Sequence, residues 1–337
     1  MRKLTELNPA GKRVVVRVDW NVSLGRALQV VDDTRIKRTV PTVRWLLDNG
    51  ARQVVLFSHL GKHGEGKSLR EVAKYAERLV GEPVSFCETA EQCGVDTTSR
   101  VILLENLRMW EGEDRNDSAF AKQLASLGEV YVNEAFGECH RESASIIGIP
   151  TLISGYAGLN LVEEVETLLR VRDNSERPFV VVMGGAKVED KLKLLEMMSQ
   201  KADTLLIGGK LANEFVRQKL KLTGTAKVVV PAEGVNLLDI GEETRKIFAE
   251  AIASAKTVVW NGPMGKVEDE QYQAGTHAIY EALVANQSAY TVVGGGDTLA
   301  AIRDEKHLER IDFVSTGGGA MLKLLEQGTL VGLRVLE

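Results

Sequence analysis

The sequence contains few cysteine, proline and aromatic residues. Its 337 residues include three cysteines and seven prolines, and 5% are aromatic. So few prolines exclude a protein made mainly of disordered linker. The cysteines, Cys87, Cys93 and Cys139, form no close Cys-x-x-Cys pair, and the first residues do not resemble a signal peptide. An odd number of thiols in such a chain predicts that all three are reduced and that the protein is cytoplasmic.

An excess of positive charge and long apolar runs are also absent. The 42 lysines and arginines are outnumbered by 47 acidic residues, which gives a formal net charge of −5. Because there is no basic tail and aromatic residues are few, we expect no nucleic-acid partner. No apolar run approaches the ~20 residues that span a bilayer, so we expect no membrane partner. The 44% of hydrophobic residues is ordinary for a globular chain, and the length predicts two domains.

What the sequence does contain is a regular alternation of short β-branched runs and helical patterns. In the first half the expected strands are 13–18, 54–58, 101–104 and 130–132, and the expected helices are 34–49, 68–80 and 117–127. In the second half the strands are 179–183, 204–207, 227–230, 257–260, 290–293 and 312–315, and the helices are 190–200, 242–253, 271–284, 298–304 and 319–327. This alternation predicts parallel sheets covered by helices, and apolar residues at helical spacing predict a connecting helix at 161–172.

Four strands of the second half end in glycines. The most informative is 292–301, where two valines are followed by Gly294, Gly295 and Gly296, and then by Asp297 and Thr298 before helix-forming residues. Glycines allow a phosphate to approach the backbone, and free N–H groups at a helix start attract anions. Asp297 is placed to hold a divalent cation. Each such segment alone is equally well explained as a plain turn, but together the segments 180–187, 205–209, 292–301 and 314–320 indicate one nucleotide bound by several loops.

Polar and cationic residues follow the strands of the first half. Because the carboxyl ends of parallel strands share one edge of a sheet, these side chains are expected to converge on one anion. The cationic or imidazole residues are Arg35, His59, Lys62, Arg108 and Arg141, and Asp19 and Asn21 are available for hydroxyl groups. The planar guanidinium group suits carboxylate and phosphate oxygens. The alternative for any single arginine is an ordinary surface ion pair.

Ten short motifs carry a resemblance to a known family. In the first half they are Arg-Val-Asp-Trp-Asn (17–21), Asp-Asp-Thr-Arg-Ile (32–36), Ser-His-Leu-Gly-Lys (58–62), Glu-Asn-Leu-Arg (105–108) and Gly-Glu-Cys-His-Arg (137–141). In the second half they are Gly-Gly-Ala-Lys-Val (184–188), Asp-Lys-Leu (190–192), Val-Trp-Asn-Gly-Pro-Met-Gly (259–265), Gly-Gly-Gly-Asp-Thr (294–298) and Ser-Thr-Gly-Gly-Gly-Ala (315–320). In this order, and over nearly the whole chain, they resemble the phosphoglycerate kinase family.

The resemblance implies a fold and a reaction. The fold is α/β, with two Rossmann-like domains, each a parallel sheet flanked by helices, joined by an interdomain helix. The implied boundaries are a glycerate-binding domain at 1–160, a helix and linker at 161–178, a nucleotide-binding domain at 179–329, and a segment at 330–337 that returns to the first domain. The reaction is reversible Mg²⁺-dependent phosphoryl transfer from 1,3-bisphosphoglycerate to ADP, giving 3-phosphoglycerate and ATP. It requires closure of the two domains, and the protein is expected to be a monomer.

The resemblance also implies roles for individual positions. The glycerate-site positions are Asp19, Asn21, Arg35, His59, Lys62, Arg108 and Arg141. The nucleotide-site positions are Gly184, Gly185, Lys187, Lys191, Gly208, Gly209, Asn261, Glu268, Gly294, Gly295, Gly296, Asp297 and Thr298, with Asp297 on the metal. The positions implied to act on the transferring phosphoryl group are Arg35, Lys187, Gly317 and Gly318.

The chain departs from the family pattern at several places. It is shorter than most members by tens of residues, and the gap falls between Phe215 and Gly241, which puts the adenine side of the nucleotide site in question. Lys62 stands where the family usually has arginine, and Ser143 where it often has histidine. A second hypothesis is therefore a catalytically weakened paralogue that binds a nucleotide or phosphometabolite. A Rossmann dehydrogenase is disfavoured, because no Gly-x-Gly-x-x-Gly follows the first strand.

Overall fold

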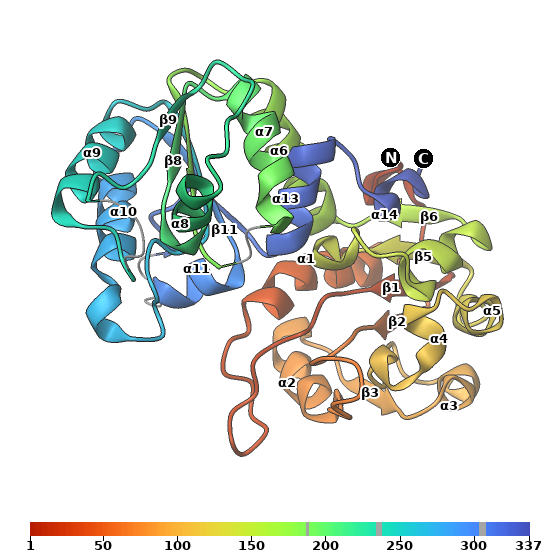
Figure 1. The fold of residues 1–337 in the computed structure, drawn as a ribbon. Coiled ribbons are helices and arrows are strands. Elements are labelled where there is room, and N and C mark those ends of the chain that lie inside the picture. Colours follow the sequence, from red (N-terminus) through yellow and green to blue (C-terminus); the bar gives the residue numbers. More distant parts are fainter. Residues whose placement is uncertain (187–188, 234–237, 303–307) are drawn as a thin grey trace. The chain divides into compact units, whose positions relative to one another are not determined.

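The computed structural model describes residues 1–186, 189–233, 238–302 and 308–337, which form two compact units (Figure 1). Unit 1 consists of Met1–Val165 and Thr329–Glu337, and unit 2 of Glu166–Gly328. Each unit has its own six-stranded sheet, and the described strand pairings in both sheets are parallel. The prediction of an α/β fold with two parallel sheets is therefore confirmed.

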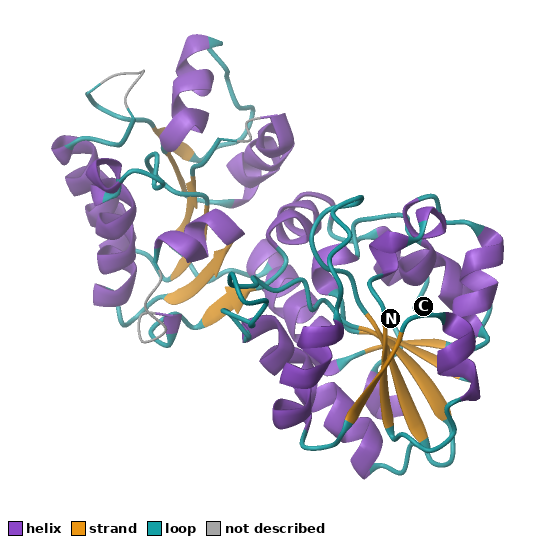
Figure 2. Cartoon of the chain, turned by 90° about the horizontal axis from the view of Figure 1, so that it is seen from below, coloured by secondary structure: helices purple, strands orange, loops and turns teal. Residues whose placement is uncertain are grey.

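The sheet of unit 1 has the strand order β3-β4-β2-β1-β5-β6. Its strands are β1 (Arg13–Arg17), β2 (Gln53–Phe57), β3 (Val84–Cys87), β4 (Val101–Leu104), β5 (Val130–Asn133) and β6 (Gly155–Ala157). The central strand β1 carries three consecutive valines that are wholly buried, as expected for a parallel strand covered on both faces. Figure 2 shows helices on both faces of this sheet, in the unit that carries both chain ends.

Helices cover the sheet of unit 1. They are α1 (Thr34–Asp48), α2 (Arg70–Val80), α3 (Ala90–Val95), α4 (Glu111–Asp114), α5 (Ser118–Ala125), α14 (Val331–Arg334) and the first part of α6 (Leu159–Asp173). Short single-turn helices are η1 (Leu4–Glu6), η2 (Leu107–Met109), η3 (Phe136–Glu138), η4 (Ala144–Gly148) and η5 (Ile149–Thr151). Buried Trp20, just after β1, donates from Nε1 to Oγ1 of Thr39 on α1 at 2.7 Å. This bond attaches α1 to the residues that follow β1.

The sheet of unit 2 has the strand order β12-β11-β10-β7-β8-β9. Its strands are β7 (Phe179–Met183), β8 (Thr204–Ile207), β9 (Lys227–Val229), β10 (Thr257–Asn261), β11 (Tyr290–Gly294) and β12 (Phe313–Ser315). Its helices are α7 (Glu189–Lys201), α8 (Gly209–Arg217), α9 (Glu242–Ala253), η6 (Glu270–Tyr272), α10 (Ala274–Ala285), α11 (Gly296–Ala301) and α13 (Gly318–Gln327). The core includes Trp260, Phe248 and Ile279, all fully buried.

Several elements, among them β3, β6 and α8, have no counterpart among the elements expected from the sequence; the others are the short helices α3, α4, α14 and the single-turn helices. Strand β3 has two half-buried residues and no apolar alternation, and β6 has only three residues and begins with glycine. Both are edge strands, where a short hydrogen-bonded segment needs little apolar pattern. Helix α8 begins at Gly209, in a segment that the sequence indicated as a phosphate-binding turn. Its buried face of Leu211, Ala212 and Phe215 lies beyond those glycines.

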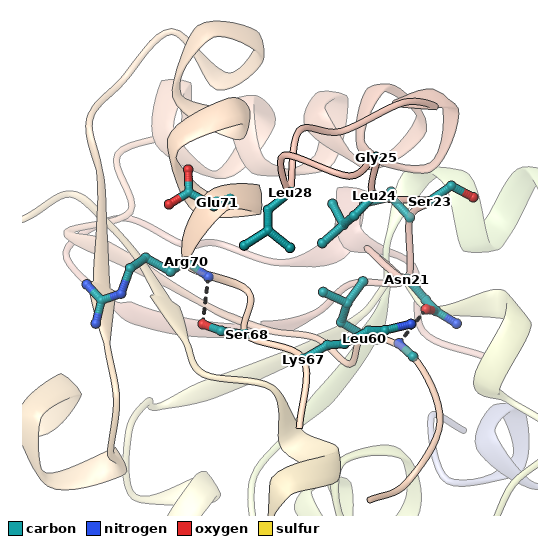
Figure 3. A pocket seen from close by; sticks show the side chains of 12 residues that line it. Asn21, Ser23, Leu24, Gly25, Leu28, Leu60, Lys67, Ser68, Arg70 and Glu71 are labelled. Atoms are coloured by element: carbon teal, nitrogen blue, oxygen red, sulfur yellow. Dashed lines mark hydrogen bonds between the residues drawn. The ribbon is translucent and has the colours of Figure 1, made fainter. Parts of the chain in front are cut away.

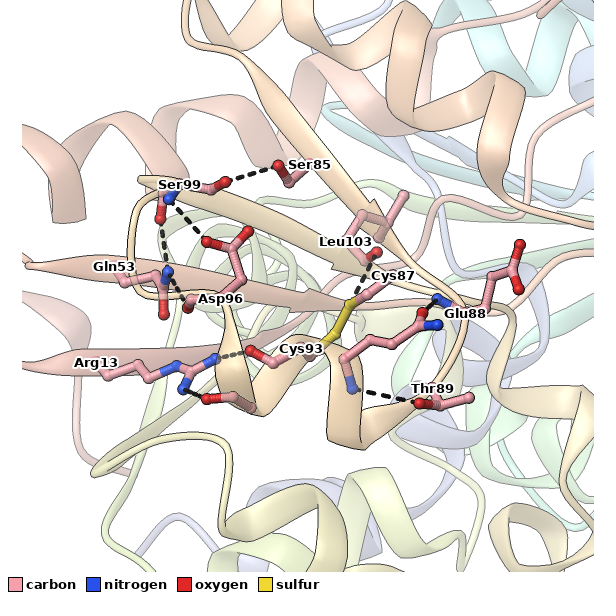
Figure 4. Close-up of a disulfide and its surroundings, with 12 residues drawn as sticks. Arg13, Gln53, Ser85, Cys87, Glu88, Thr89, Cys93, Asp96, Ser99 and Leu103 are labelled. Carbon is pink, nitrogen blue, oxygen red and sulfur yellow. Dashed lines mark hydrogen bonds between the residues drawn. A yellow bond between two sulfur atoms is a disulfide. The ribbon is translucent and has the colours of Figure 1, made fainter.

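The prediction of three reduced cysteines is wrong for one pair. Cys87 at the end of β3 and Cys93 in α3 are joined by a disulfide, with their Cα atoms 5.5 Å apart (Figure 4). The turn at Glu88 and Thr89 reverses the chain, so that two cysteines six residues apart face each other. Cys139 remains a free thiol and is buried, and this burial raises its pKa well above the ordinary value.

Residues Thr329–Glu337 pack within unit 1, although 163 residues of unit 2 precede them in the chain. The backbone N–H of Arg2 donates to the carbonyl of Leu336 at 2.8 Å, and that of Gly332 to the carbonyl of Cys139 at 2.9 Å. A Cβ atom on Gly332 would lie 3.0 Å from Cα of Cys139, so the close approach requires glycine there. The two chain ends therefore lie side by side in unit 1 (Figure 1). In the described part of the chain, no helix combines the length and the apolarity that a membrane crossing needs.

A buried carboxylate holds the start of α6 against the sheet of unit 1. Glu134, directly after β5, accepts hydrogen bonds from the backbone N–H groups of Asn160 at 3.0 Å and Leu161 at 2.9 Å. It also accepts the hydroxyl hydrogen of Thr42, whose Oγ1 accepts from the N–H of Leu159. These bonds satisfy N–H groups that the first turn of a helix leaves without an intrahelical partner. Burial outweighs them and raises the pKa of Glu134 from 4.5 to about 7.

The free energy of unfolding of unit 1 should fall as the pH rises from 4.5 to about 7. In this window Glu134 is protonated in the folded state and ionised in the unfolded chain, so the folded state binds one more proton and loses stability with rising pH. The total loss is on the order of 3 kcal/mol, since one pKa unit corresponds to about 1.4 kcal/mol. In urea unfolding across this window, the stability of the wild type relative to Glu134→Gln should fall by this amount, because the other titrating groups contribute equally to both proteins.

The matched control for this experiment is Glu142→Gln, because Glu142 is an exposed glutamate in the same unit. It should keep the wild-type slope. The same slope in wild type and Glu134→Gln would show that another group titrates.

Candidate functional site

The candidate site of unit 1 lies at the carboxyl edge of its sheet. Asp19 follows β1, His59 follows β2, Arg108 lies in η2 after β4, and Arg141 follows η3 beyond β5. Because the strands are parallel, their carboxyl ends meet at one edge. Asp19 lies 3.9 Å from His59, and His59, Arg108 and Arg141 all lie within 3.2–3.7 Å of Glu138, so the residues form one cluster.

Arg35 joins this edge from the first turn of α1. Its Nη1 donates to Oδ2 of Asp19 at 2.7 Å, and its side chain is one-third exposed. Burial by itself would raise the pKa of Asp19, but the nearby Arg35, His59 and Arg17 outweigh it and hold that pKa below its ordinary value. Asp19 is therefore an ionised acceptor that orients the Arg35 guanidinium group and leaves part of it open to solvent.

His59 is a neutral side chain at this edge, and its Nε2–H group is directed at two carboxylates. Arg17 Nη2 lies 3.1 Å from Nδ1 of His59, and because a guanidinium group only donates, Nδ1 must accept and Nε2 must carry the hydrogen. Nε2 faces Oδ1 of Asp19 at 3.9 Å and Oε1 of Glu138 at 3.7 Å. Burial is the largest cause that holds the pKa of His59 well below its ordinary value; the negative charge of Asp19 raises this pKa, and the neighbouring arginines lower it further.

Glu138 lies in the middle of the cationic groups. Its Oε2 accepts from Nη2 of Arg108 at 3.2 Å, and its Oε1 lies 3.3 Å from Nε of Arg141. Arg17 Nη2 is 4.0 Å from Oε2. Burial, as the largest cause, raises the pKa of Glu138 despite these positive charges.

Arg17 supports the cluster from beneath. It is 1% exposed, and its Nε donates to Oγ of Ser145 at 2.8 Å, while Nη1 donates to the carbonyl of Val18. Ser145 in turn donates from its backbone N–H to Glu113 at 2.9 Å and also from its hydroxyl group. The sequence reasoning assigned no role to Arg17, Glu138 or Ser145. A signal was available for Arg17, since an arginine that follows three buried valines at the end of a central strand requires a buried partner.

Asn21 and Lys62 differ in how they join this edge. Asn21 Oδ1 accepts the N–H of Gly61 at 2.8 Å, which ties the segment after β1 to the segment after β2. Lys62 is exposed in the turn that follows, and none of the hydrogen bonds and ion pairs described joins its side chain to the other six predicted residues.

A cavity of about 760 Å³ opens beside Asn21 (Figure 3). Its lining combines apolar side chains with polar and charged ones: Asn21, Val22, Ser23, Leu24, Gly25, Leu28, Leu60, Gly61, Lys67, Ser68, Arg70 and Glu71. Asn21 and Gly61 thus belong both to the cavity wall and to the carboxyl edge. Leu28, with a positive φ of 63°, points into the cavity and is 58% exposed.

In unit 2, the loops after β7 and β10 pack directly against each other. The N–H of Gly184 donates to the carbonyl of Asn261 at 3.0 Å, and that of Gly185 to the carbonyl of Pro263 at 2.8 Å. A Cβ atom on Gly184 would lie 2.2 Å from the oxygen of Pro263, so this approach excludes any side chain. Gly185 also has a φ of 85°, in the region that favours glycine.

The loops after β11 and β12 complete the group. Asn261 Nδ2 donates to the carbonyl of Gly294 at 2.9 Å, and buried Thr298 accepts the N–H of Gly262 at 2.7 Å. Gly295 has a φ of 103°, and a Cβ atom on Gly318 would lie 3.1 Å from its Cα. The structure therefore brings together three of the four glycine-ended strands that the sequence indicated, β7, β11 and β12, with the loop after β10.

The remaining predicted nucleotide-site residues surround these loops. Lys191 in α7 is 5% exposed and donates from Nζ to the carbonyl of Gly184. A Cβ atom on Gly209, which has a φ of 59°, would lie 2.9 Å from the N atom of Gly185, and the N–H of neighbouring Gly208 donates to the carbonyl of Met183 at 2.9 Å.

Some of the predicted nucleotide-site residues are exposed to solvent. Gly296 has nothing within 4 Å of the position of a Cβ atom, and Asp297 and Glu268 are exposed. Gly317 is buried at the start of α13. Lys187, predicted to follow the moving phosphoryl group, lies outside the described residues.

Comparisons with known proteins extend over the whole chain. A family profile described as phosphoglycerate kinase matches residues 4–233 and 222–328. The phosphoglycerate kinase of Herpetosiphon aurantiacus is 38% identical, with 97% of each chain covered, and that of Moorella thermoacetica is 40% identical, with 100% of this chain and 99% of that one covered. These alignments run over 383 and 394 positions, so the relatives carry segments that this chain of 337 residues lacks.

Solved structures agree with the sequence relatives. The phosphoglycerate kinase from Coxiella burnetii superimposes with a TM-score of 0.84 at 32% identity, covering 99% of this chain and 98% of that one. The enzyme from Pyrococcus horikoshii superimposes with a TM-score of 0.86 at 27% identity, covering 100% and 98%. Together with the family match, these two parallel-sheet units define a two-domain α/β phosphotransferase. The chain belongs to the phosphoglycerate kinase family.

Replacing Arg17 by methionine should destabilise unit 1 by about 3–5 kcal/mol, since removing one partner of a buried ionic network leaves the other groups uncompensated. Ser145 would lose the donor to its hydroxyl oxygen, and His59 the donor to Nδ1. Urea unfolding measures the loss, with Arg115→Met as control because that side chain is 75% exposed. A loss no larger than that of the control would contradict the supporting role of Arg17.

Proposed function

We propose that this protein catalyses the reversible transfer of a phosphoryl group from 1,3-bisphosphoglycerate to ADP, with 3-phosphoglycerate and ATP as products. The observation that carries the proposal is the cluster of Arg35, Arg108 and Arg141 with His59 at one sheet edge, in a chain that matches the family over its full length. Formation of ATP from 1,3-bisphosphoglycerate and MgADP in a coupled assay tests it directly.

The cluster in unit 1 suits a small organic anion that carries phosphate. Guanidinium groups bind phosphate and carboxylate oxygens through two parallel N–H donors. Arg141 is half exposed and Arg35 one-third exposed, so both can reach a ligand while Asp19 and Glu138 hold their inner sides. Asp19 and Asn21 are the candidates for contacts with the glycerate hydroxyl. Lys62 would supply a further positive charge from its exposed turn.

Phosphoryl transfer needs positioning and positive charge more than a general base. The transferring group spreads negative charge over its equatorial oxygens, and the acceptor, a carboxylate or a nucleotide phosphate, is already ionised. In this proposal Arg35 and Lys187 supply the charge, and the backbone of Gly317 and Gly318 at the start of α13 supplies N–H donors. No serine or histidine nucleophile is required.

The glycine-rich loops of unit 2 suit the phosphates of ADP or ATP. Thr298, Asn261 and Lys191 hold the loops in place, and the space around Gly296 leaves room for a ligand beside the start of α11. Gly208, Gly209 and Glu268 are the candidates for the base and ribose side.

The glycine-rich loops of unit 2 are also the proposed site of Mg²⁺. Among the residues that the structure describes, there is no group of three or more His, Cys, Asp or Glu side chains that could hold a metal ion alone. Mg²⁺ is usually bound through one or two carboxylates together with substrate phosphates, and exposed Asp297 provides one such carboxylate. The ion would offset phosphate charge when the nucleotide is bound. A monomeric state and a cytoplasmic location are further parts of the proposal.

Arg35→Ala should lower kcat by about 10²–10³-fold, the usual effect of removing one donor to a transition-state charge. ADP affinity should stay within about twofold, because Arg35 belongs to unit 1 and the nucleotide loops belong to unit 2. Lys37→Ala is the control, since this side chain is 56% exposed on the same helix. Near-parental turnover of Arg35→Ala would refute the role of Arg35.

Asp297→Asn should weaken binding of MgADP by about tenfold and leave binding of metal-free ADP unchanged, because hard cations prefer carboxylate oxygens. Calorimetry with and without Mg²⁺ separates the two effects. Glu281→Gln, an exposed charge change elsewhere in unit 2, should change neither affinity. Equal MgADP affinity in Asp297→Asn and wild type would exclude Asp297 as a ligand of the metal.

A further inference from the structure

The carboxylate of Glu138 lies among the cationic side chains at the carboxyl edge of the sheet in unit 1. Its two oxygens contact guanidinium groups from two segments: Oε2 takes Nη2 of Arg108 at 3.2 Å, and Oε1 lies 3.3 Å from Nε of Arg141. His59 Nε2 is 3.7 Å from Oε1, and Arg17 Nη2 is 4.0 Å from Oε2. These are contacts that a phosphate or carboxylate ligand would need.

Glu138 is fixed in this place by the fold. It ends η3, directly after the segment that leads out of β5, and only 8% of the residue is exposed. Arg108 is held on its other side, since its Nη1 donates to the carbonyl of Gly61. The Glu138 carboxylate therefore cannot move away from Arg108 without also losing Arg141, and Arg108 cannot move without losing its hydrogen bond to Gly61.

The charges around Glu138 come from every element packed against it. Positive groups are Arg17 at the end of β1, Arg108 in η2 and Arg141 after η3, and Asp19 after β1 is negative. His59 after β2 is neutral, because its pKa lies well below the ordinary value. Burial, as the largest cause, raises the pKa of Glu138, and Asp19 raises it further.

We propose that Glu138 competes with the anionic group of the substrate for Arg108 and Arg141, so that substrate binding is coupled to protonation of Glu138. The proposal rests on the proposed function, since it takes 3-phosphoglycerate as the ligand of this cluster. A ligand anion beside an ionised Glu138 is repelled by it. When a proton is bound to Glu138 this repulsion is removed, and the guanidinium groups are released for the ligand.

The coupling has a definite direction. A ligand anion raises the pKa of Glu138 still further, so binding takes up a proton and affinity falls as the pH rises. Glu138→Gln keeps the shape of the side chain but removes its charge. The variant should therefore bind 3-phosphoglycerate more tightly than wild type at alkaline pH, by roughly 5- to 150-fold, the usual span for linked binding events. The two affinities should converge at acidic pH, where Glu138 of the wild type is protonated.

The experiment is a calorimetric titration of wild type, Glu138→Gln and Glu142→Gln with 3-phosphoglycerate across a series of pH values. The phosphate of the ligand also titrates, but it does so equally with all three proteins, so the difference between wild type and Glu138→Gln reports Glu138 alone. Glu142 lies four residues further along the chain and is exposed, so Glu142→Gln should match the wild type at every pH.

A second measurement follows the titration in the wild type and does not depend on the folding of Glu138→Gln. Carbon-13 NMR of the side-chain carboxyl groups follows the titration of Glu138, assigned by comparison with Glu138→Asp. Addition of 3-phosphoglycerate should shift its apparent pKa upward. An unshifted titration of Glu138 would overturn the proposal whether or not Glu138→Gln folds.

The outcomes separate this proposal from the function on which it rests. If wild type binds 3-phosphoglycerate and Glu138→Gln binds it equally or more weakly at alkaline pH, Glu138 orients the arginines and does not compete, and only this proposal fails. If wild type neither binds 3-phosphoglycerate nor forms ATP, the proposed function fails and the proposal with it. Tighter binding by Glu138→Gln, converging at acidic pH, supports it.

Discussion

The buried guanidinium group of Arg17 is the interaction on which the cationic edge of unit 1 depends. It ends the central strand and makes contacts with the segments that follow two other strands: with His59 after β2, and with Ser145 beyond β5. A buried cation is tolerated only when all its donors find acceptors. Each partner is thereby fixed in position, and the His59 tautomer is set as a consequence. The edge is preorganised because hydrogen bonds of Arg17 to Ser145, Val18 and His59 hold its supporting layer in place.

Unit 2 reaches preorganisation by a different physical route. There the site is made of backbone, and the constraint is the distance of closest approach between loops. Gly184 and Gly209 stand where any side chain would collide with the loop after β10 or β7. Asn261 and Thr298 then fix the loops by hydrogen bonds to backbone groups. A phosphate site needs N–H groups and room, and glycines supply both. One unit thus presents charged side chains, and the other presents backbone donors.

The apolar pattern of the sequence predicted the correct bounds of several elements that are long or strongly apolar. Strands β7 and β8 and helix α9 begin and end where the sequence predicts, because each pattern contains a full apolar face. The edge strands β3 and β6 could not be found in this way, since three or four residues contain too little periodicity to distinguish a strand from a loop. The disulfide between Cys87 and Cys93 was missed for a related reason, because spacing alone does not show which thiols a turn brings together.

The sequence by itself determined the alternation of strands and helices, the glycine-ended strands and the motifs that carry the family resemblance, because each of these is written in consecutive residues. Only the tertiary structure decided what the charged residues do to one another. Glu138 and Arg108 are thirty positions apart, and their pairing exists because parallel strands end at a common edge. Protonation states follow from burial and from such neighbours, as the neutral His59 and the raised pKa of Glu138 show. Neither the pairing of a charged residue nor its protonation state is defined in the unfolded chain, because both depend on neighbours that only the fold brings close.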